Sequence, residues 1–167
     1  MARTHQAATT VRFYQLANMP LETALVGIVG KAWERGMLVN LLARDQRQAQ
    51  RLDDLFWIHP PPHHFLPHGM WNAPDPELQP VLISLEPDER NGATLLVLAA
   101  PHLLAEPARF DMIIDFLPGQ DAEGLVAGRH RYRHYRALGC QMEYWTQGPQ
   151  GGWKKQTAET TTAEQAK

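Results

Sequence analysis

The chain has 167 residues, of which 44% are hydrophobic and 20% are charged, a composition typical of globular proteins that excludes overall disorder. Its length fits one domain, and its formal net charge of −2 disfavours a uniformly basic nucleic-acid-binding protein. The single cysteine, Cys140, excludes an internal disulfide, and because the longest apolar run (residues 95–100) is too short for a membrane span and no signal peptide is recognisable, we expect a cytoplasmic protein without membrane contact.

The first part of the chain alternates between short apolar runs and helical periods. Residues 11–16 (VRFYQL) predict a strand. Apolar residues then recur over 21–32 at the spacing of one helical face, and Gly36 ends that helix. The nearly continuous apolar run 37–42 (MLVNLL) predicts a strand that is covered on both faces.

A second helix and a proline-rich loop follow. Asp45 and Gln48 resemble an N-cap pair, and the helix after them carries an apolar stripe that ends at Phe56. Residues 58–80 contain seven of the thirteen prolines, so we expect an extended loop with one short edge strand at Phe65–Leu66.

The remaining elements complete the predicted sheet. We expect strands at 81–85, 94–100, 111–117 and 141–145, and a helix at 120–138. Strands separated by helices predict a single three-layer α/β domain, with a mixed, mostly parallel sheet and helices on both faces.

The same pattern predicts the domain boundaries. The α/β domain occupies residues 11–145. Residues 1–10 and 146–167 lack a packable apolar pattern, and we expect them to form a disordered lead-in and a disordered C-terminal tail.

No nucleotide or cofactor site is predicted for this fold. The segment with Gly27, Gly30 and Lys31 has the wrong glycine spacing for a phosphate-binding loop and lies inside a predicted helix. No G-x-G-x-x-G pattern follows a predicted strand either, so a dinucleotide site is equally unsupported.

Four histidines at short spacing, His59, His63, His64 and His68, raise the question of a metal site. Prolines interrupt the set, and no cysteine or nearby acid completes a ligand shell. We therefore expect a polar loop and no bound metal.

Large aromatic residues beside the same prolines leave two interpretations open. Trp57, Phe65 and Trp71 could form a contact surface, as aromatic side chains on rigid loops often do, or they could close the edge of the core.

No catalytic group is predicted. Ser84 lies in a buried strand pattern, and Cys140 is expected to be a buried structural thiol. Asp111 and Asp115 on one strand would lie about 13 Å apart by its rise, too far for an acid/base pair.

The sharpest local signal is RHRYRHYR at residues 129–136, which contains four arginines and no acid. On a helix, Arg129, Arg133 and Arg136 fall within about 60° of one another, and Tyr132 lies beside them at the border of the apolar side. This stripe could be a solvated helix face, a site for an acidic peptide with a hydrophobic end, or a site for single-stranded nucleic acid. With so few phosphate contacts available, nucleic acid is the weaker of the two functional interpretations.

The chain resembles the chi subunits of the bacterial DNA polymerase III holoenzyme over about residues 11–145. The order and spacing of several segments carry the resemblance. They are VRFYQL at Val11, KAWERGMLVNLLARD at Lys31, QAQRLDDLFW at Gln48, FLPH at Phe65, and IIDFLPGQD followed by RYRHYRALG.

The resemblance implies a nucleotide-binding-like fold without a nucleotide site, cofactor or catalytic residue. It implies a non-catalytic subunit of a DNA-directed DNA polymerase, a nucleotidyltransferase complex, that contacts DNA only indirectly. The implied partners are the psi subunit of the clamp loader and the acidic C-terminal tail of single-stranded DNA-binding protein, which ends in an aromatic residue with a free carboxylate. In some members a repair helicase replaces psi.

By position, the resemblance also implies site residues. Residues implied for binding the tail are Leu117, Arg129, Tyr132, Arg133 and Arg136, of which Arg136 is suggested by a departure from the family pattern. The family often has a basic residue one turn before the arginine at the position of Arg129, whereas this chain has Glu123-Gly124-Leu125 there. Residues implied for binding psi are Trp57 and Phe65, beside the unusual stretch of residues 61–64.

Overall fold

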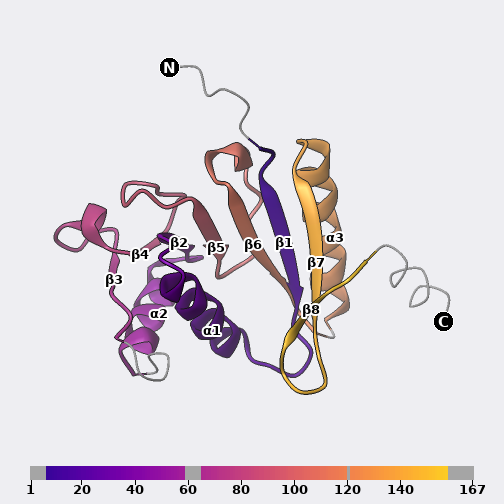
Figure 1. Ribbon diagram of the computed structural model, residues 1–167, viewed down its shortest axis with the longest axis horizontal. Coiled ribbons are helices and arrows are strands. Elements are labelled where there is room, and N and C mark those ends of the chain that lie inside the picture. Colours follow the sequence, from indigo (N-terminus) through magenta and orange to yellow (C-terminus); the bar gives the residue numbers. More distant parts are fainter. Residues whose placement is uncertain (1–6, 59–64, 120, 158–167) are drawn as a thin grey trace.

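The computed structural model describes residues 7–58, 65–119 and 121–157. They form one sheet with helices packed on both of its faces (Figure 1). The strand order is β3-β4-β2-β5-β6-β1-β7-β8. Neighbouring strands are parallel except for β7 and β8, which are antiparallel. The prediction of a mixed, mostly parallel sheet in an α/β domain is therefore confirmed.

The observed elements follow the predicted order. The strands are β1 Thr10–Gln15, β2 Val39–Leu42, β3 His68–Met70, β4 Val81–Ser84, β5 Leu95–Leu98, β6 Met112–Leu117, β7 Gln141–Gln147 and β8 Trp153–Lys155. The helices are α1 Leu21–Glu34, α2 Gln46–Ile58 and α3 Ala122–Ala137, with short 3-10 turns at Pro76–Leu78 and Pro107–Arg109.

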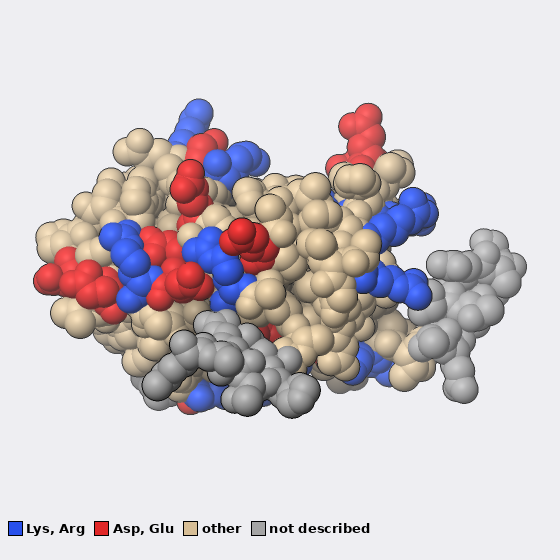
Figure 2. All heavy atoms as spheres, turned by 90° about the horizontal axis from the view of Figure 1, so that it is seen from above, with Lys and Arg blue, Asp and Glu red and all other residues tan. Residues whose placement is uncertain are grey.

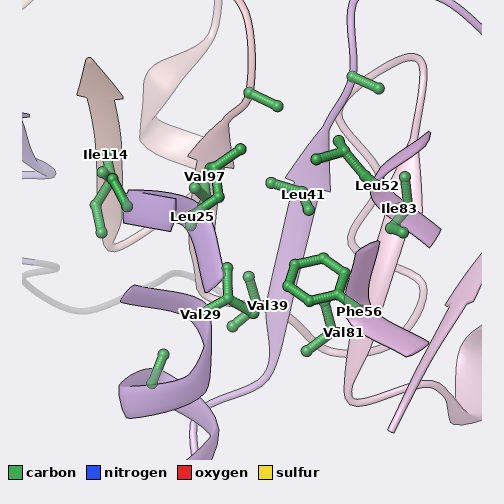
Figure 3. Packing of buried hydrophobic residues seen from close by; sticks show 14 of the residues in the cluster. Leu25, Val29, Val39, Leu41, Leu52, Phe56, Val81, Ile83, Val97 and Ile114 are labelled. Atoms are coloured by element: carbon green, nitrogen blue, oxygen red, sulfur yellow. The ribbon is translucent and has the colours of Figure 1, made fainter. Parts of the chain in front are cut away.

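Helices α1 and α2 cover one face of the sheet. Each presents one apolar stripe, and these stripes pack on strand residues that alternate in direction along β2 and β4. Figure 3 shows Leu25 and Val29 of α1, and Phe56 of α2, directed at the sheet. Every residue of β2, β4 and β5 is buried, as expected for central strands covered on both faces.

Helix α3 covers the opposite face, over β6, β1 and β7. Phe13 and Tyr135 are fully buried between the helix and the sheet. A close approach of the helix to β6 depends on Gly128, because a Cβ at that position would lie 2.1 Å from a methyl group of Leu117. Among the described elements, α3 is the one α-helix on this face, and its outer flank is open to solvent (Figure 1).

The N-terminus of α2 confirms the predicted N-cap pair. The Gln48 amide donates to Asp45 Oδ1 at 2.8 Å, and Gln48 Oε1 accepts a hydrogen bond from the Arg44 amide at 2.7 Å. The first of these bonds is the main reason why the pKa of Asp45 lies below its ordinary value. Side chains thus satisfy two backbone donors at the entry to the helix.

Two short strands differ from the prediction. In the proline-rich loop the strand is β3, at His68–Met70, and not at Phe65–Leu66. In the predicted disordered tail, residues 153–155 form β8, which pairs with the end of β7. The ring of Trp153 packs edge-on against Tyr14, with the ring centroids 4.8 Å apart. This distant contact supplies the apolar burial that the local sequence lacks.

Tyr135 gives the fold a testable dependence on pH. Its hydroxyl donates to the carbonyl oxygen of His102 at 2.9 Å and accepts from the Leu104 amide at 3.3 Å. Burial raises the pKa of Tyr135 to about 12. Because the folded state resists ionisation while the unfolded chain ionises near pH 10, this residue's contribution to stability is complete below pH 10 and is lost as the pH rises towards 12.

We therefore expect the variant Tyr135→Phe to be less stable than the parent chain by about 1–2 kcal/mol at pH 8, because Leu104 loses its acceptor. This deficit should shrink between pH 10 and pH 12, since phenylalanine cannot ionise. Urea unfolding of both chains across this range would measure the difference. A deficit that stays constant with pH would contradict the assigned role of burial.

Candidate functional site

The exposed flank of α3 is the first candidate surface. Asp121 caps the N-terminus of the helix, and its Oδ1 accepts a hydrogen bond from the Glu123 amide at 3.1 Å. Arg129, Arg133 and Arg136 are all exposed on the helix that follows. Within the described part of the chain, none of these three arginines takes part in an ion pair. Their guanidinium groups are therefore available to an anionic partner.

The fourth arginine of the RHRYRHYR segment has a different role. Arg131 is buried and contacts Asp115 of β6 through two hydrogen bonds, 2.7 Å from Nε to Oδ2 and 3.0 Å from Nη2 to Oδ1. Burial raises the pKa of Asp115, while the hydrogen bonds and positive charge of Arg131 act in the opposite direction. This pair attaches α3 to the sheet and fixes which flank of the helix faces outward.

Tyr132 lies between the exposed arginines and the core. Its ring packs on Phe13 with the centroids 5.6 Å apart, and it is only partly buried. Leu117 lies deeper, beneath Gly128, with 9% of its surface exposed. The structure thus brings Tyr132 together with the arginine flank, whereas Leu117 lies under the buried side of the helix.

Basic side chains project from the end of the molecule that α3, β7 and β8 form (Figure 2). Basic and acidic side chains alternate at the opposite end, where they can neutralise one another (Figure 2). An acidic side chain also projects there, but α3 carries four arginines and one acidic residue, Glu123, so the helix is positively charged although the formal net charge of the whole chain is −2.

A second candidate surface lies at the end of α2. Trp57, Ile58 and Phe65 expose 57%, 69% and 62% of their surfaces, and the rings of Trp57 and Phe65 are in contact, with centroids 5.4 Å apart. Trp71, by contrast, packs against the main core. The structure therefore favours a contact surface for Trp57 and Phe65, and the alternative interpretation, closure of the core edge, for Trp71.

His68 holds this aromatic surface in place. Its buried ring lies 4.9 Å from the Trp57 ring. Nδ1 contacts the carbonyl oxygen of Leu66 at 2.8 Å, and Nε2 lies 3.2 Å from the backbone oxygen and 3.3 Å from Oδ1 of Asp53. One imidazole thus connects α2 to the loop that carries Phe65.

The two surfaces lie at opposite ends of the sheet (Figure 1). The aromatic surface of Trp57, Ile58 and Phe65 adjoins α2 and the edge strand β3, whereas the arginine flank adjoins β7 at the other end. The two candidate surfaces therefore share no residue.

Comparison with known proteins identifies the family. A family model described as DNA polymerase III chi subunit matches residues 8–143, which is most of the chain. The chain belongs to the DNA polymerase III chi subunit family. It is 28% identical over 124 residues to the DNA polymerase III subunit chi of Escherichia coli (strain K12), covering 73% of this chain and 82% of that protein. It is 24% identical over 152 residues to a probable DNA polymerase III subunit chi of Rickettsia prowazekii (strain Madrid E), covering 85% of this chain and 88% of that protein.

Family membership confirms the resemblance seen in the sequence. It makes the chain a chi-type accessory subunit of DNA polymerase III, a protein of DNA replication. Among the described residues, no helix combines the length and apolar composition that crossing a bilayer requires.

The glycine-rich segment and the cysteine of this chi-family chain lie in settings that do not suit phosphate binding or nucleophilic catalysis. Gly27, Gly30 and Lys31 lie within α1, so their amides belong to a helix and cannot wrap a phosphate. Burial raises the pKa of the Cys140 thiol, which is opposite to the shift that activates a nucleophile.

The histidine cluster is only partly described. His59, His63 and His64 lie outside the described residues, and His68 is committed to the contacts given above. Elsewhere in the described ranges, no group of three or more His, Cys, Asp or Glu side chains could hold a metal ion.

A pocket of about 290 Å³ lies on the inner flank of α3, at the carboxyl ends of β5 and β6. In parallel α/β sheets this edge is where ligands usually bind. Here the lining is mainly apolar, and Asp115 and Arg131 on its wall already satisfy each other. The remaining charged residue of the lining, Asp121, accepts a hydrogen bond from the Glu123 amide, so the pocket offers a ligand one carboxylate and otherwise mainly apolar surface.

Two residues with a part in the site, Arg131 and His68, were not predicted from the sequence in these roles. A signal existed for Arg131, because Asp115 interrupts an otherwise apolar strand and a buried carboxylate requires a cationic partner. No comparable local signal marked His68, whose partners are backbone oxygens in a proline-rich loop and on α2.

Proposed function

We propose that this chi-family chain is a non-catalytic bridge within the bacterial DNA polymerase III holoenzyme. It connects the clamp loader, through the psi subunit, to single-stranded DNA-binding protein by capturing that protein's acidic C-terminal tail. The observation that carries the proposal is the exposed flank of Arg129, Arg133 and Arg136, which has no acidic partner within the described chain.

The chemistry of the flank suits such a tail. A guanidinium group can bind a terminal carboxylate with two parallel hydrogen bonds. Tyr132 beside the arginines is partly buried against Phe13, so it offers apolar surface to the aromatic side chain at the end of the tail. A partner that combines negative charge with one apolar end therefore fits better than a uniformly charged one.

The aromatic surface of Trp57, Ile58 and Phe65 suits the psi subunit. Large aromatic side chains that are exposed together are typical of the centre of protein interfaces. A repair helicase that used the same surface would compete with psi, whereas tail binding at the other end of the sheet would be unaffected by either partner.

Replacing Arg129 with alanine should weaken binding of a synthetic tail peptide by about 1.5–3 kcal/mol, the loss expected for a charge-assisted hydrogen-bonded contact. Titration calorimetry with the free-carboxylate peptide would measure this loss. Added salt should weaken the contact without abolishing it, because its apolar part is not screened. The matched control is Arg47→Ala, since Arg47 is an exposed arginine on α2 at the far end of the molecule.

Unchanged affinity of the Arg129→Ala variant would contradict the proposed tail site. A pull-down with full-length and tail-truncated single-stranded DNA-binding protein tests the same point on whole proteins, and equal capture of both would also contradict it. Direct binding of single-stranded nucleic acid is the competing outcome. It would appear as affinity for a bare oligonucleotide with a salt dependence that reflects several phosphates.

A further inference from the structure

Strand β8 lies beyond the residues that the chi family model matches. The family model ends at residue 143, whereas β8 occupies Trp153–Lys155 and pairs with the end of β7. It is the outermost strand of the sheet, at the edge beside α3 (Figure 1). Strand β8 therefore extends the surface next to the proposed tail site.

The register of the hairpin assigns the two lysines of β8 to opposite faces. Trp145 stands opposite Lys155, and Thr146 stands opposite Lys154. Trp145 stacks on Tyr14, which belongs to the core under α1 and α2. Since successive strand residues alternate between faces, Lys154 lies on the face of the sheet that α3 covers.

The lysine on the other face is already neutralised. Lys155 Nζ lies 3.2 Å from Glu143 Oε1, and Arg12 Nε lies 2.7 Å from Oε2 of the same carboxylate. Burial opposes ionisation of Glu143, but the hydrogen bonds from Trp145 and Lys155 and the charge of Arg12 outweigh it, so its pKa is lowered. Lys155 is therefore not free to attract a partner.

Lys154, in contrast, is exposed and has no ion pair in the described part of the chain. Several contacts hold its strand in place. Trp153 packs on Tyr14, the Gln156 side chain donates to Thr146 Oγ1 at 2.6 Å, and the Gln156 amide donates to the Tyr144 carbonyl oxygen at 2.8 Å.

Side chains of α3 and β7 lie between Lys154 and the arginine flank. Leu125 and Tyr132 of α3 pack in one cluster with Met142 and Tyr144 of β7. Residues Tyr144 and Thr146 then lead along the same face of β7 to the position opposite Lys154. Partly buried apolar and polar side chains thus lie between two groups of cations, one on α3 and one on β8.

We propose that Lys154 of β8 is a further binding residue for the acidic tail, and that the tail lies across the surface between α3 and the β7–β8 hairpin. This inference rests on the proposed tail-binding function. The arginine flank binds the terminal carboxylate and its neighbours, and Lys154 attracts an acidic residue farther from the end of the tail. Charge complementarity favours an acidic peptide as the occupant, because Arg129, Arg133, Arg136 and Lys154 are exposed cations without an ion pair in the described part of the chain.

The test uses the full chain and a labelled synthetic peptide with the C-terminal sequence of the single-stranded DNA-binding protein from the same cell. Lys154→Gln should weaken peptide binding about twofold to fivefold, as expected for one exposed charge contact, and Lys154→Glu should weaken it further. The matched control, Lys155→Gln, removes the same charge from the opposite face of the same strand and should leave the affinity unchanged.

Each outcome decides between the proposals. If Arg129→Ala weakens peptide binding but Lys154→Gln does not, the role of Lys154 is overturned while the tail site on α3 stands. The same conclusion follows if Lys154→Gln and Lys155→Gln weaken binding equally. If Arg129→Ala has no effect, the proposed function itself fails. As a second measurement, the peptide should shift the amide NMR signals of Thr146 and Lys154 in the unaltered chain, and unmoved signals there would also overturn the inference.

Discussion

Replacing Asp115 with alanine is expected to lower the free energy of unfolding by about 3–5 kcal/mol, the loss expected when one partner of a buried ion pair is removed. Asp115 and Arg131 are both almost inaccessible to solvent, with 1% and 5% of their surfaces exposed. In the variant, the Arg131 guanidinium would stay buried without an anion, or α3 would have to move to release it to water. Chemical unfolding followed by circular dichroism would measure the loss.

The double variant Asp115→Ala/Arg131→Met is the control for this expectation. It removes both charges and fills the arginine's volume with an apolar side chain, so it should recover much of the lost stability. A single variant that loses less than about 1 kcal/mol would show that the pair is well solvated, in conflict with its burial. A double variant no more stable than the single one would show that the carboxylate has a structural role beyond pairing.

The same pair matters for the arginine flank. If α3 were rotated about its axis by the angle of one residue, Arg129 and Arg133 would turn by about 100°. The bidentate contact of Arg131 with Asp115 allows only one rotation. We infer that the buried arginine sets the direction in which the exposed arginines point, although it touches no partner itself.

The large elements of this fold could be predicted because each has a local pattern. Central strands such as β2 and β5 are short, nearly continuous apolar runs, and α1 shows apolar residues at helical spacing. Burial on two faces or on one face selects these patterns directly. The order of strands and helices then implied parallel pairing.

The short strands could not be predicted because their stability comes from distant residues. Strand β8 has one apolar residue, Trp153, whose partner Tyr14 lies in the first strand of the chain. Strand β3 contains His68, whose two ring nitrogens contact backbone oxygens on either side of residues 59–64. Neither case leaves a periodic signal in the sequence.

The candidate site was predicted in part. Helical geometry placed Arg129, Arg133 and Arg136 on one flank, and all three are exposed there. The sequence did not show that Arg131 lies on the opposite flank as the partner of Asp115. All four arginines add the same charge to the segment, and helical spacing does not say which flank is buried. Separating them required the position of the core, which depends on β6 and on Gly128.

Replacing Trp57 with alanine is expected to weaken binding of the psi subunit by about 2–4 kcal/mol, the loss typical of a central aromatic residue in an interface. Trp57 exposes 57% of its surface and contacts the exposed ring of Phe65. Binding of psi would cover both rings and remove their apolar surface from water. A loss of 2 kcal/mol corresponds to roughly a 30-fold increase in Kd, which surface plasmon resonance with purified psi would resolve.

Val126→Ala is the matched control, because Val126 is an exposed apolar residue on α3 (64% exposed) at the other end of the sheet, and it should leave psi binding unchanged. Since most of Trp57 is exposed, its replacement should change the free energy of unfolding by much less than the binding loss. The tail peptide should bind the Trp57→Ala variant with unaltered affinity. The effects of Trp57→Ala on psi binding and of Arg129→Ala on tail binding should be independent, because the two sites share no contact. Full psi affinity in the Trp57→Ala variant, or a parallel loss of tail binding, would contradict the assignment of two separate surfaces.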